Sequence, residues 1–300
     1  MNNSFSYCAY GLGIKSCIPF LELQEEEVIE QSVEIKFGKV NGLTGEATLK
    51  SNNFSANRDE ILFFLEDAGS FFIQKGMNII IDPISGVKEN VLRNYILGAS
   101  LAMLLYQRDY LILHASTVMI GNNCVSFLGS SGWGKSTLAA TLCAKGHRLI
   151  SDDVCAINLN KDLPKVYPAA PQIKLCLDAA NFIKNDLNGF EILENVFDKI
   201  PYLVKNKFSK EPIPLKHIYV LTDDDKEEIY PLALQETLVE LIRHTYRIQM
   251  ITSLDPSSHF LKCVNLAKAV PVSLLKRRRD LELLPKLVDM LEREHMALYV

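Results

Sequence analysis

The segment Gly129–Ser136 constrains the fold of this chain more than any other part of its sequence. It matches the pattern G-x-x-x-x-G-K-S/T, follows an apolar run at Cys124–Leu128 and precedes a helical run from about Lys135 to Lys145. This order predicts a strand, a glycine-rich loop and a helix. The glycines let the backbone curl so that its N–H groups, with the positive end of the following helix, bind phosphate oxygens. A nucleoside triphosphate with magnesium is therefore the expected ligand.

Two residues of this loop have distinct expected roles. Lys135 is expected to reach the β- and γ-phosphates, and Ser136 is expected to ligate Mg²⁺. A chance glycine-rich turn is the alternative, and the position of the loop between a strand and a helix argues against it. The predicted nucleotide-binding set is Gly129, Ser130, Ser131, Gly132, Trp133, Gly134, Lys135, Ser136 and Thr137.

The pair Asp152–Asp153 follows the apolar stretch Arg148–Ile150. A helix of about 11 residues carries the chain about 17 Å away from the phosphates, and a strand of about 5 to 6 residues at about 3.3 Å each brings it back. A right-handed crossover makes the two strands parallel and close neighbours. We therefore expect both carboxylates beside Ser136, one holding Mg²⁺ and the other facing the nucleophile. An exposed Asp-Asp turn is the alternative.

Other polar residues are weaker candidates for the same site. His114 lies in the strand that precedes the loop strand, and it is expected either to contact phosphate or substrate or to be a hydrogen-bonded core residue. Four cations are candidate charge clamps, each of which is by default a solvated surface residue. These four are Lys174, Arg243, Arg247 and Arg278.

Composition excludes several classes of function. The formal net charge of −4, with Lys and Arg scattered until Lys276–Arg279, argues against nucleic acid as the main partner. The 7 cysteines have no metal-ligand spacing and are expected to be reduced in a cytoplasmic protein. The start at Met1–Ser4 lacks a signal-peptide pattern, and the longest apolar stretch, near Tyr95–Tyr106, is shorter than the about 20 residues of a spanning helix. No membrane partner is expected, and homo-oligomerisation is left open.

The chain is expected to contain two parts. Residues 1–88 hold short β-like runs separated by turn formers such as Gly69 and Gly76, which predicts a small, mostly-β N-terminal subdomain. A helix is expected from about Asn90 to Gln107, and it begins the catalytic domain at 89–300. A hairpin with its turn at Gly121–Asn123 is expected before the glycine-rich loop. Strands near 154–159 and 217–221 and helices near 235–246, 259–269 and 281–293 are expected after it.

Three segments together resemble the HPr kinase/phosphorylase catalytic domain and its relatives. They are Leu113–Ser116, the loop Gly129–Ser136, and Gly146–Asp153, and the short spacing from loop to aspartate pair is the diagnostic feature. The resemblance implies an α/β fold, a P-loop domain with a mixed sheet similar to phosphoenolpyruvate carboxykinase. The downstream Glu-x-Arg-Gly-x-Gly segment of true HPr kinases has no counterpart here, which puts HPr in doubt as the substrate. The chain instead resembles divergent bacterial members, some of which phosphorylate a serine of lasso-peptide precursors.

The resemblance also implies roles for individual residues. Lys135 and Ser136 grip phosphate and metal, Asp152 and Asp153 supply the base and a metal contact, and His114 lies near the transferred phosphate. Ser136 and Asp153 are the candidate metal ligands, and which aspartate is the base stays open. ATP is the expected donor, because Asn160–Leu163 is not the Asn-Lys-x-Asp motif that selects guanine.

The leading hypothesis is thus an ATP- and Mg²⁺-dependent kinase acting on a serine hydroxyl of a peptide or protein. A kinase of free serine or another metabolite and a non-catalytic nucleotide-sensing regulator are the alternatives. The intact Lys135, Ser136 and aspartate pair argue against the regulator.

Overall fold

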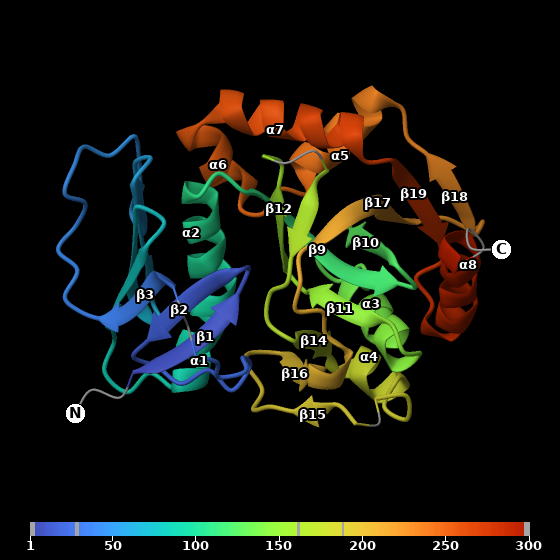
Figure 1. The fold of residues 1–300 in the computed structure, drawn as a ribbon, viewed down its shortest axis with the longest axis horizontal. Coiled ribbons are helices and arrows are strands. Elements are labelled where there is room, and N and C mark those ends of the chain that lie inside the picture. Colours follow the sequence, from blue (N-terminus) through green and yellow to red (C-terminus); the bar gives the residue numbers. More distant parts are fainter. Residues whose placement is uncertain (1–3, 28–29, 161–162, 188, 297–300) are drawn as a thin grey trace.

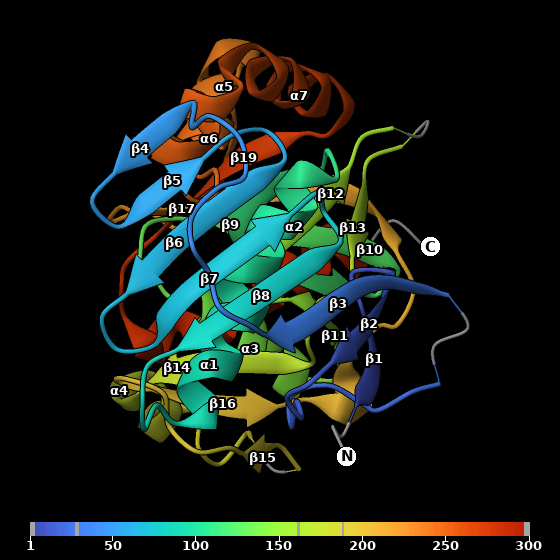
Figure 2. The ribbon, with the colours of Figure 1, turned by 90° about the vertical axis from the view of Figure 1, so that its left-hand side faces the viewer.

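The computed structural model describes residues 4–27, 30–160, 163–187 and 189–296, and an eight-stranded sheet forms its N-terminal part. The strand order is β1-β2-β3-β8-β7-β6-β5-β4, with parallel pairing only at β2–β3 and β3–β8. Figure 2 shows this sheet face on. Side chains alternate between its faces, so Ile61 and Phe63 of β6 point inward while Phe64 is exposed. The strands are β1 (Phe5–Ala9), β2 (Leu12–Ser16), β3 (Gln31–Phe37), β4 (Leu49–Ser51), β5 (Phe54–Ala56), β6 (Glu60–Leu65), β7 (Gly69–Gln74) and β8 (Asn78–Pro83).

A helical run lies between this sheet and the rest of the chain (Figure 1). It consists of α1 (Glu89–Tyr95), a π-helical turn η1 (Ile96–Ser100) and α2 (Leu101–Gln107). All five residues from Leu101 to Leu105 are buried, as expected for a helix enclosed by protein on every side. The predicted helix is confirmed, whereas its π-helical turn was not predicted.

One hydrophobic core joins the N-terminal sheet, this helical run and the edge of the second sheet. Ile61 and Phe71 of the first sheet belong to the same cluster as Leu104 of α2 and Val154 of the second sheet. The N-terminal part is mostly β, as expected. Because the helical run packs against both parts, the division into 1–88 and 89–300 does not coincide with two separate cores and stays a prediction.

The second sheet is mixed and contains the loop strand. Its two long strands each pair with different partners at their two ends. β9 pairs with β12 at one end and with β10 and β11 at the other. β17 pairs with β13 at one end and with β10 and β19 at the other. The strands are β9 (Leu111–Ile120), β10 (Asn123–Leu128), β11 (Arg148–Ser151), β12 (Val154–Asn158), β13 (Lys165–Tyr167), β17 (Ile213–Asp223), β18 (Glu228–Pro231) and β19 (Val272–Arg277). The predicted β9–β10 hairpin is confirmed.

Helices cover both faces of this sheet because the side chains of β10 alternate. Val125 and Phe127 pack with α3 (Lys135–Ala144) and α8 (Leu284–Met296), while Cys124 and Leu128 pack with α5 (Leu234–Arg243) and α7 (Pro256–Ala269). The mixed α/β class is confirmed. The remaining elements are a small sheet of β14 (Gln172–Cys176), β15 (Glu191–Ile192) and β16 (Lys199–Leu203), the helices α4 (Leu177–Phe182) and α6 (Ile248–Leu254), and the 3₁₀ turns η2 (Lys205–Lys207) and η3 (Leu281–Leu283).

Two further predictions concern membrane-spanning helices and the segment near residue 161. Within the described ranges, no helix is both long enough and apolar enough to cross a membrane. Lys161 and Asp162, which the guanine-motif argument used, lie outside the described residues.

Candidate active site

The glycine-rich loop leaves the sheet where the sequence places it, between the end of β10 and the start of α3. Leu128, the last residue of β10, pairs with Ala115 of β9, and α3 begins at Lys135. Gly129, Gly132 and Gly134 have φ values of 156°, 77° and 79°. A Cβ at Gly134 would lie 3.1 Å from Nη2 of Arg277, so this position suits glycine for both its φ and its space. The loop therefore presents the N-terminus of α3, whose first N–H groups lack helical partners.

Asp152 and Asp153 occupy a break between β11 and β12. Both strands pair antiparallel with β9, in a register that sets Ser151 opposite Thr117 and Val154 opposite His114. The two aspartates fill the gap, and the chain turns there because Asp153 adopts a left-handed φ of 69°. They are thus held at the middle of β9, level with the point where β10 ends and the loop begins.

The strand order corrects one step of the prediction. β10 and β11 run in the same direction, as expected, but β9 lies between them, so they are not neighbours. One edge of β10 pairs with β9 in the hairpin and the other pairs with β17, which leaves β11 only the far edge of β9. Asp152 nevertheless reaches the start of α3 directly, through its hydrogen bond with Ser136, and Ser116 on the intervening β9 also donates to it.

Asp152 is the aspartate that contacts Ser136. Its Oδ1 accepts hydrogen bonds from Ser136 Oγ at 2.9 Å and from Ser116 Oγ at 2.6 Å, and its Oδ2 accepts one from the backbone N–H of Lys174 at 3.1 Å. Burial and the charge of Asp153 raise the pKa of Asp152, against the opposing effect of these hydrogen bonds. The prediction placed the metal contact on Asp153, whereas the hydrogen bond joins Ser136 to Asp152.

Asp153 pairs instead with His114, the histidine singled out in the sequence. His114 Nε2 lies 3.4 Å from Asp153 Oδ1, and both side chains are about one-third exposed, at 34% and 31%. Burial would raise the pKa of Asp153, but the hydrogen bond with His114 and the charges of Lys174 and Lys199 outweigh it and hold the pKa well below its usual range. Asp153 is therefore ionised at neutral pH and reachable from the surface.

Lys135 lies over its own loop. Its Nζ donates to the carbonyl oxygens of Gly129 at 2.7 Å and Ser130 at 3.1 Å. Burial lowers the pKa of Lys135, and the charges of Asp152 and Asp153 oppose that effect. The ammonium group is thus enclosed against the loop, with these two carbonyl oxygens as its partners. The next predicted residue, Thr137, is buried in the first turn of α3.

Two arginines that the sequence did not single out support the loop from outside. Arg277, at the end of β19, donates from Nη2 to the Trp133 carbonyl, and Arg279 donates to the Gly132 carbonyl at 3.1 Å. Arg279 also lies over the Trp133 ring, 5.5 Å from its centroid. The basic run Lys276–Arg279 directly after a strand was the available signal. The predicted clamp Arg278 instead pairs with Asp225 on the surface, at 3.1 Å.

The other three candidate clamps differ from one another. Arg243 is exposed and pairs with Glu240 at 2.6 Å. Lys174 belongs to the site, because its backbone N–H binds Asp152 and its Nζ donates to Asn94 Oδ1 at 2.6 Å. Arg247 has a left-handed φ of 52° at the start of α6.

The segment from His244 to Arg247 brings further residues that sequence reasoning missed. It continues along β9 beyond the end of β10: His114 N–H donates to the His244 carbonyl at 2.8 Å, and Tyr246 N–H donates to the Ile112 carbonyl at 2.9 Å. The ring of Tyr246 lies edge-on to that of His114, with centroids 6.2 Å apart. Burial, together with nearby Lys135, lowers the pKa of His244 to about 4. No local motif marks this segment, which follows the loop by more than 100 residues.

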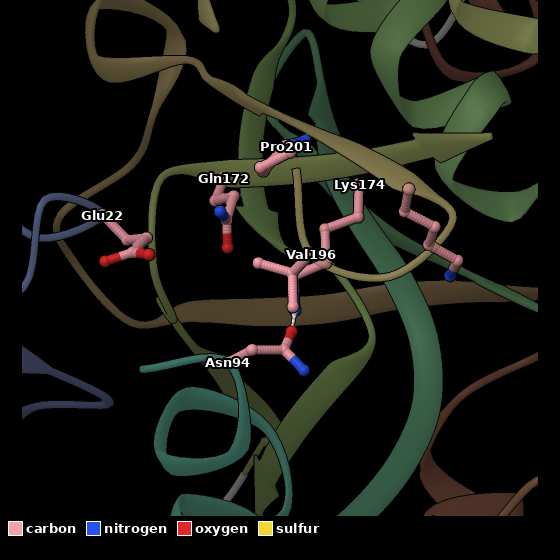
Figure 3. Close-up of a pocket in the computed structure, with 7 residues that line it drawn as sticks. Glu22, Asn94, Gln172, Lys174, Val196 and Pro201 are labelled. Atoms are coloured by element: carbon pink, nitrogen blue, oxygen red, sulfur yellow. Dashed lines mark hydrogen bonds between the residues drawn. The ribbon is translucent and has the colours of Figure 1, made fainter. Parts of the chain in front are cut away.

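A small pocket adjoins the aspartates on the side of β14 and β16 (Figure 3). Figure 3 shows Lys174 and Asn94 joined by their hydrogen bond and Glu22 at the opposite end. Glu22 is buried and bonded to Arg93 through Oε1 at 3.1 Å, while its Oε2 has no partner. The cavity volume of about 10 Å³ is about the minimum that a water molecule needs. As it stands, this pocket fits a water on Glu22 rather than a substrate.

The donor atoms fit magnesium better than a softer metal. Ser136 Oγ and Asp152 Oδ1 are hard oxygen ligands beside the loop, and Mg²⁺ in nucleotide sites typically takes one or two such protein ligands besides phosphate oxygens and water. Among the residues that the structure describes, no group of three or more His, Cys, Asp or Glu side chains is placed to hold a metal ion.

Comparisons with known proteins add a fold likeness only. No protein-family model matches the sequence, and no curated protein is similar to it at a significant level. The Hpr(Ser) kinase/phosphatase from Coxiella burnetii is similar in structure, with 12% sequence identity, 63% of this chain and 99% of that chain covered, and a TM-score of 0.36. A likeness of this degree assigns neither an activity nor residue roles to this chain, and membership of the HPr kinase family stays a prediction.

Proposed function

We propose that this protein is an ATP- and Mg²⁺-dependent phosphotransferase that phosphorylates a serine hydroxyl of a peptide or protein. The observation that carries the proposal is the adjacency of two pairs: Ser136 with Asp152 beside the glycine-rich loop, and His114 with Asp153 next to it. The first pair suits a phosphate-bound metal, and the second suits an incoming hydroxyl. Phosphoryl transfer needs both, held close together.

Magnesium would be held by Ser136 and Asp152. Asp152 already bonds the Ser136 hydroxyl, and its carboxylate is fixed by Ser116 and by the backbone of Lys174. The metal, when bound, neutralises phosphate charge and orients the phosphate oxygens. Lys135 would exchange its two loop carbonyls for the β- and γ-phosphates, and the N-terminus of α3 would bind the remaining oxygens.

Asp153 is the better candidate for the base. Three hydrogen bonds use both oxygens of Asp152, whereas Asp153 contacts His114 and its side chain is partly exposed. In the proposed step the acceptor oxygen bonds to the γ-phosphorus, the bond from that phosphorus to the bridging oxygen breaks, and the hydroxyl proton passes to Asp153. Because the transition state is loose, it needs little base strength, so an ionised carboxylate is sufficient.

Two alternatives rest on the same site. A kinase of free serine or another metabolite needs a pocket that closes around its acceptor, and the small pocket near Glu22 has room for about one water. A nucleotide-sensing regulator needs no base, and the His114–Asp153 pair is then unexplained. A peptide or protein acceptor is therefore favoured, with a lasso-peptide precursor as one member of that class.

The test is transfer of label from γ-³²P ATP, with Mg²⁺, to a degenerate serine peptide library, alongside free serine and the hydrolysis blank. We expect acid-stable phosphoserine in the peptide fraction and its loss in Lys135→Ala. Label in free serine alone would select the metabolite kinase. ATP binding with neither transfer nor hydrolysis would select the regulator.

A further inference from the structure

A large groove lies between the N-terminal sheet and the 245–253 segment of the second part. Figure 2 shows β4 and β5 beside α6. Ala99 of η1 and Met103 of α2 line the groove from the helical run. Its cavity volume is about 700 Å³, within the range of sites that bind sizeable ligands. The lining residues that matter below are Phe54, Phe63, Phe64, Met250, Arg247 and Ala99.

The groove has an apolar wall and a single charge. Phe54, Phe63 and Phe64 line the sheet side, and Met250 lines the opposite side. Arg247 is its one charged lining residue, and no salt bridge joins Arg247 to a carboxylate within the described ranges. The Phe64 side chain lies on the opposite face of the sheet from Phe63, so Phe54 and Phe63 provide the aromatic side chains of this wall. Such a surface complements a ligand that combines apolar side chains with one carboxylate.

A strand edge accompanies the groove. β4 is the last strand in the order of the first sheet, so its outer backbone edge has no partner strand among the residues that the structure describes. Leu49 and Ser51 of this strand line the groove. An extended peptide can use such an edge for main-chain hydrogen bonds while its side chains enter neighbouring pockets.

The groove approaches the candidate active site at Tyr246, whose chain neighbours Thr245 and Arg247 line the groove. Arg247 follows Tyr246, whose ring packs against His114, and His114 contacts Asp153. From the helical run, Gly98 of η1 approaches the same tyrosine: a Cβ at Gly98 would lie 3.8 Å from Tyr246 Oη. A chain bound in the groove would thus pass Arg247 before reaching Asp153.

We propose that this groove binds an extended segment of the acceptor polypeptide, with apolar side chains against Phe54, Phe63 and Met250 and a carboxylate at Arg247. This inference rests on the proposed function and adds the sequence class of its acceptor. The acidic residue is expected between the acceptor serine and the apolar residues.

Two matched pairs of variants test the groove. Phe54→Ser is compared with Phe37→Ser, because Phe37 is a phenylalanine of the same sheet that lies outside the groove. Arg247→Gln is compared with Arg243→Gln, an exposed arginine of the preceding helix. Arg247→Glu is added to reverse the charge. Thermal unfolding checks that all variants are folded.

Each variant is tested in two ways with a degenerate serine peptide library: capture on the immobilised protein with Mg²⁺ and a non-hydrolysable ATP analogue, and phosphate transfer from ATP. We expect the captured and phosphorylated peptides to be enriched in apolar residues and one acid. For a selected peptide, Phe54→Ser and Arg247→Gln should raise KM about 10-fold with kcat and ATP affinity within about twofold, as the loss of one buried contact predicts. Arg247→Glu should change the acidic preference to a basic one.

The outcomes separate the two proposals. Capture with the expected selection but no transfer supports the groove and overturns the kinase function. Transfer without sequence selection, or equal KM values in the groove variants and their controls, overturns the groove and leaves the kinase function standing. Transfer to a free metabolite without capture of any peptide overturns the groove, as does binding of a second copy of this chain there in sedimentation analysis.

Discussion

The two sides of the candidate active site are built in different ways. The phosphate side comes almost entirely from one continuous stretch, in which the loop, α3 and the aspartates lie within residues 129–153. The acceptor side is assembled from distant segments: His114 of β9, Lys174 of β14, Tyr246 and Arg247 after α5, and the helical run at 89–107. Side-chain contacts of β9 with the aspartates join the two sides: Ser116 with Asp152, and His114 with Asp153.

This difference has a consequence for function. A continuous stretch keeps its geometry through local backbone structure, so the phosphate side can be formed whenever β10, α3 and β11 are formed. The acceptor side exists only while the N-terminal sheet, the helical run and the second sheet are packed together in their shared core. Substitutions on the phosphate side should therefore change chemistry, and those on the acceptor side should change acceptor binding or stability.

The largest effect, a loss of the rate of phosphoryl transfer, is expected from Lys135→Ala. Lys135 is the enclosed cation of the loop, and removing one preorganised charge from a phosphoryl-transfer site typically costs on the order of 10²–10³-fold in kcat. Lys145→Ala at the other end of α3, where the lysine forms an exposed salt bridge with Asp289, should stay within about twofold. Steady-state transfer assays measure both, and equal rates for the two variants would contradict the assigned role of Lys135.

A smaller effect is expected from Arg277→Gln. Arg277 holds the Trp133 carbonyl, and loss of a charged hydrogen bond of about 1.5 kcal/mol should weaken MgATP binding about 10-fold. The acceptor KM should stay unchanged, because this contact lies on the phosphate side. Arg278→Gln, next in sequence but paired on the surface with Asp225, is the control. Isothermal titration measures the affinity, and a weakened Arg278→Gln would show that general charge, not loop support, matters.

The smallest effect concerns stability on the acceptor side. Burial lowers the pKa of His244 to about 4, although Glu240 lies 3.4 Å away. In the unfolded chain His244 takes up a proton near pH 6.5, whereas in the folded state it stays neutral down to about pH 4. The stability that this residue contributes is therefore full above pH 6.5 and falls as the pH drops towards 4. From pH 7 to 5 the free energy of unfolding should fall by about 1–2 kcal/mol from this residue.

Urea unfolding of His244→Gln and of the unchanged protein at pH 7 and 5 isolates that contribution. The variant should lose less stability on acidification, while the part due to His217, whose pKa burial also lowers to about 4, remains. An identical loss in both proteins would mean that His244 is protonated in the folded state.

The same contrast explains which parts of the fold and of the candidate site could be predicted from the sequence. The loop, its helix, the β9–β10 hairpin and the return of the aspartates depend on local patterns and on the lengths of adjoining elements. The position of β9 between β10 and β11 depends on which sheet edges remain free, and that is decided by β17, about 90 residues later. The contacts of His244 arise only from tertiary packing, and the basic run Lys276–Arg279 marks Arg277 without showing that it contacts the loop.

In the proposed mechanism Asp152 holds the metal and Asp153 is the base. MgATP titration into Asp152→Asn and Asp153→Asn tests this assignment most directly. We predict that Asp152→Asn loses the magnesium dependence of nucleotide binding, because Asp152 contacts Ser136. Asp153→Asn should bind MgATP as the unchanged protein does and fail only in transfer to the acceptor. Loss of magnesium-dependent binding in Asp153→Asn, with Asp152→Asn unaffected, would contradict the account.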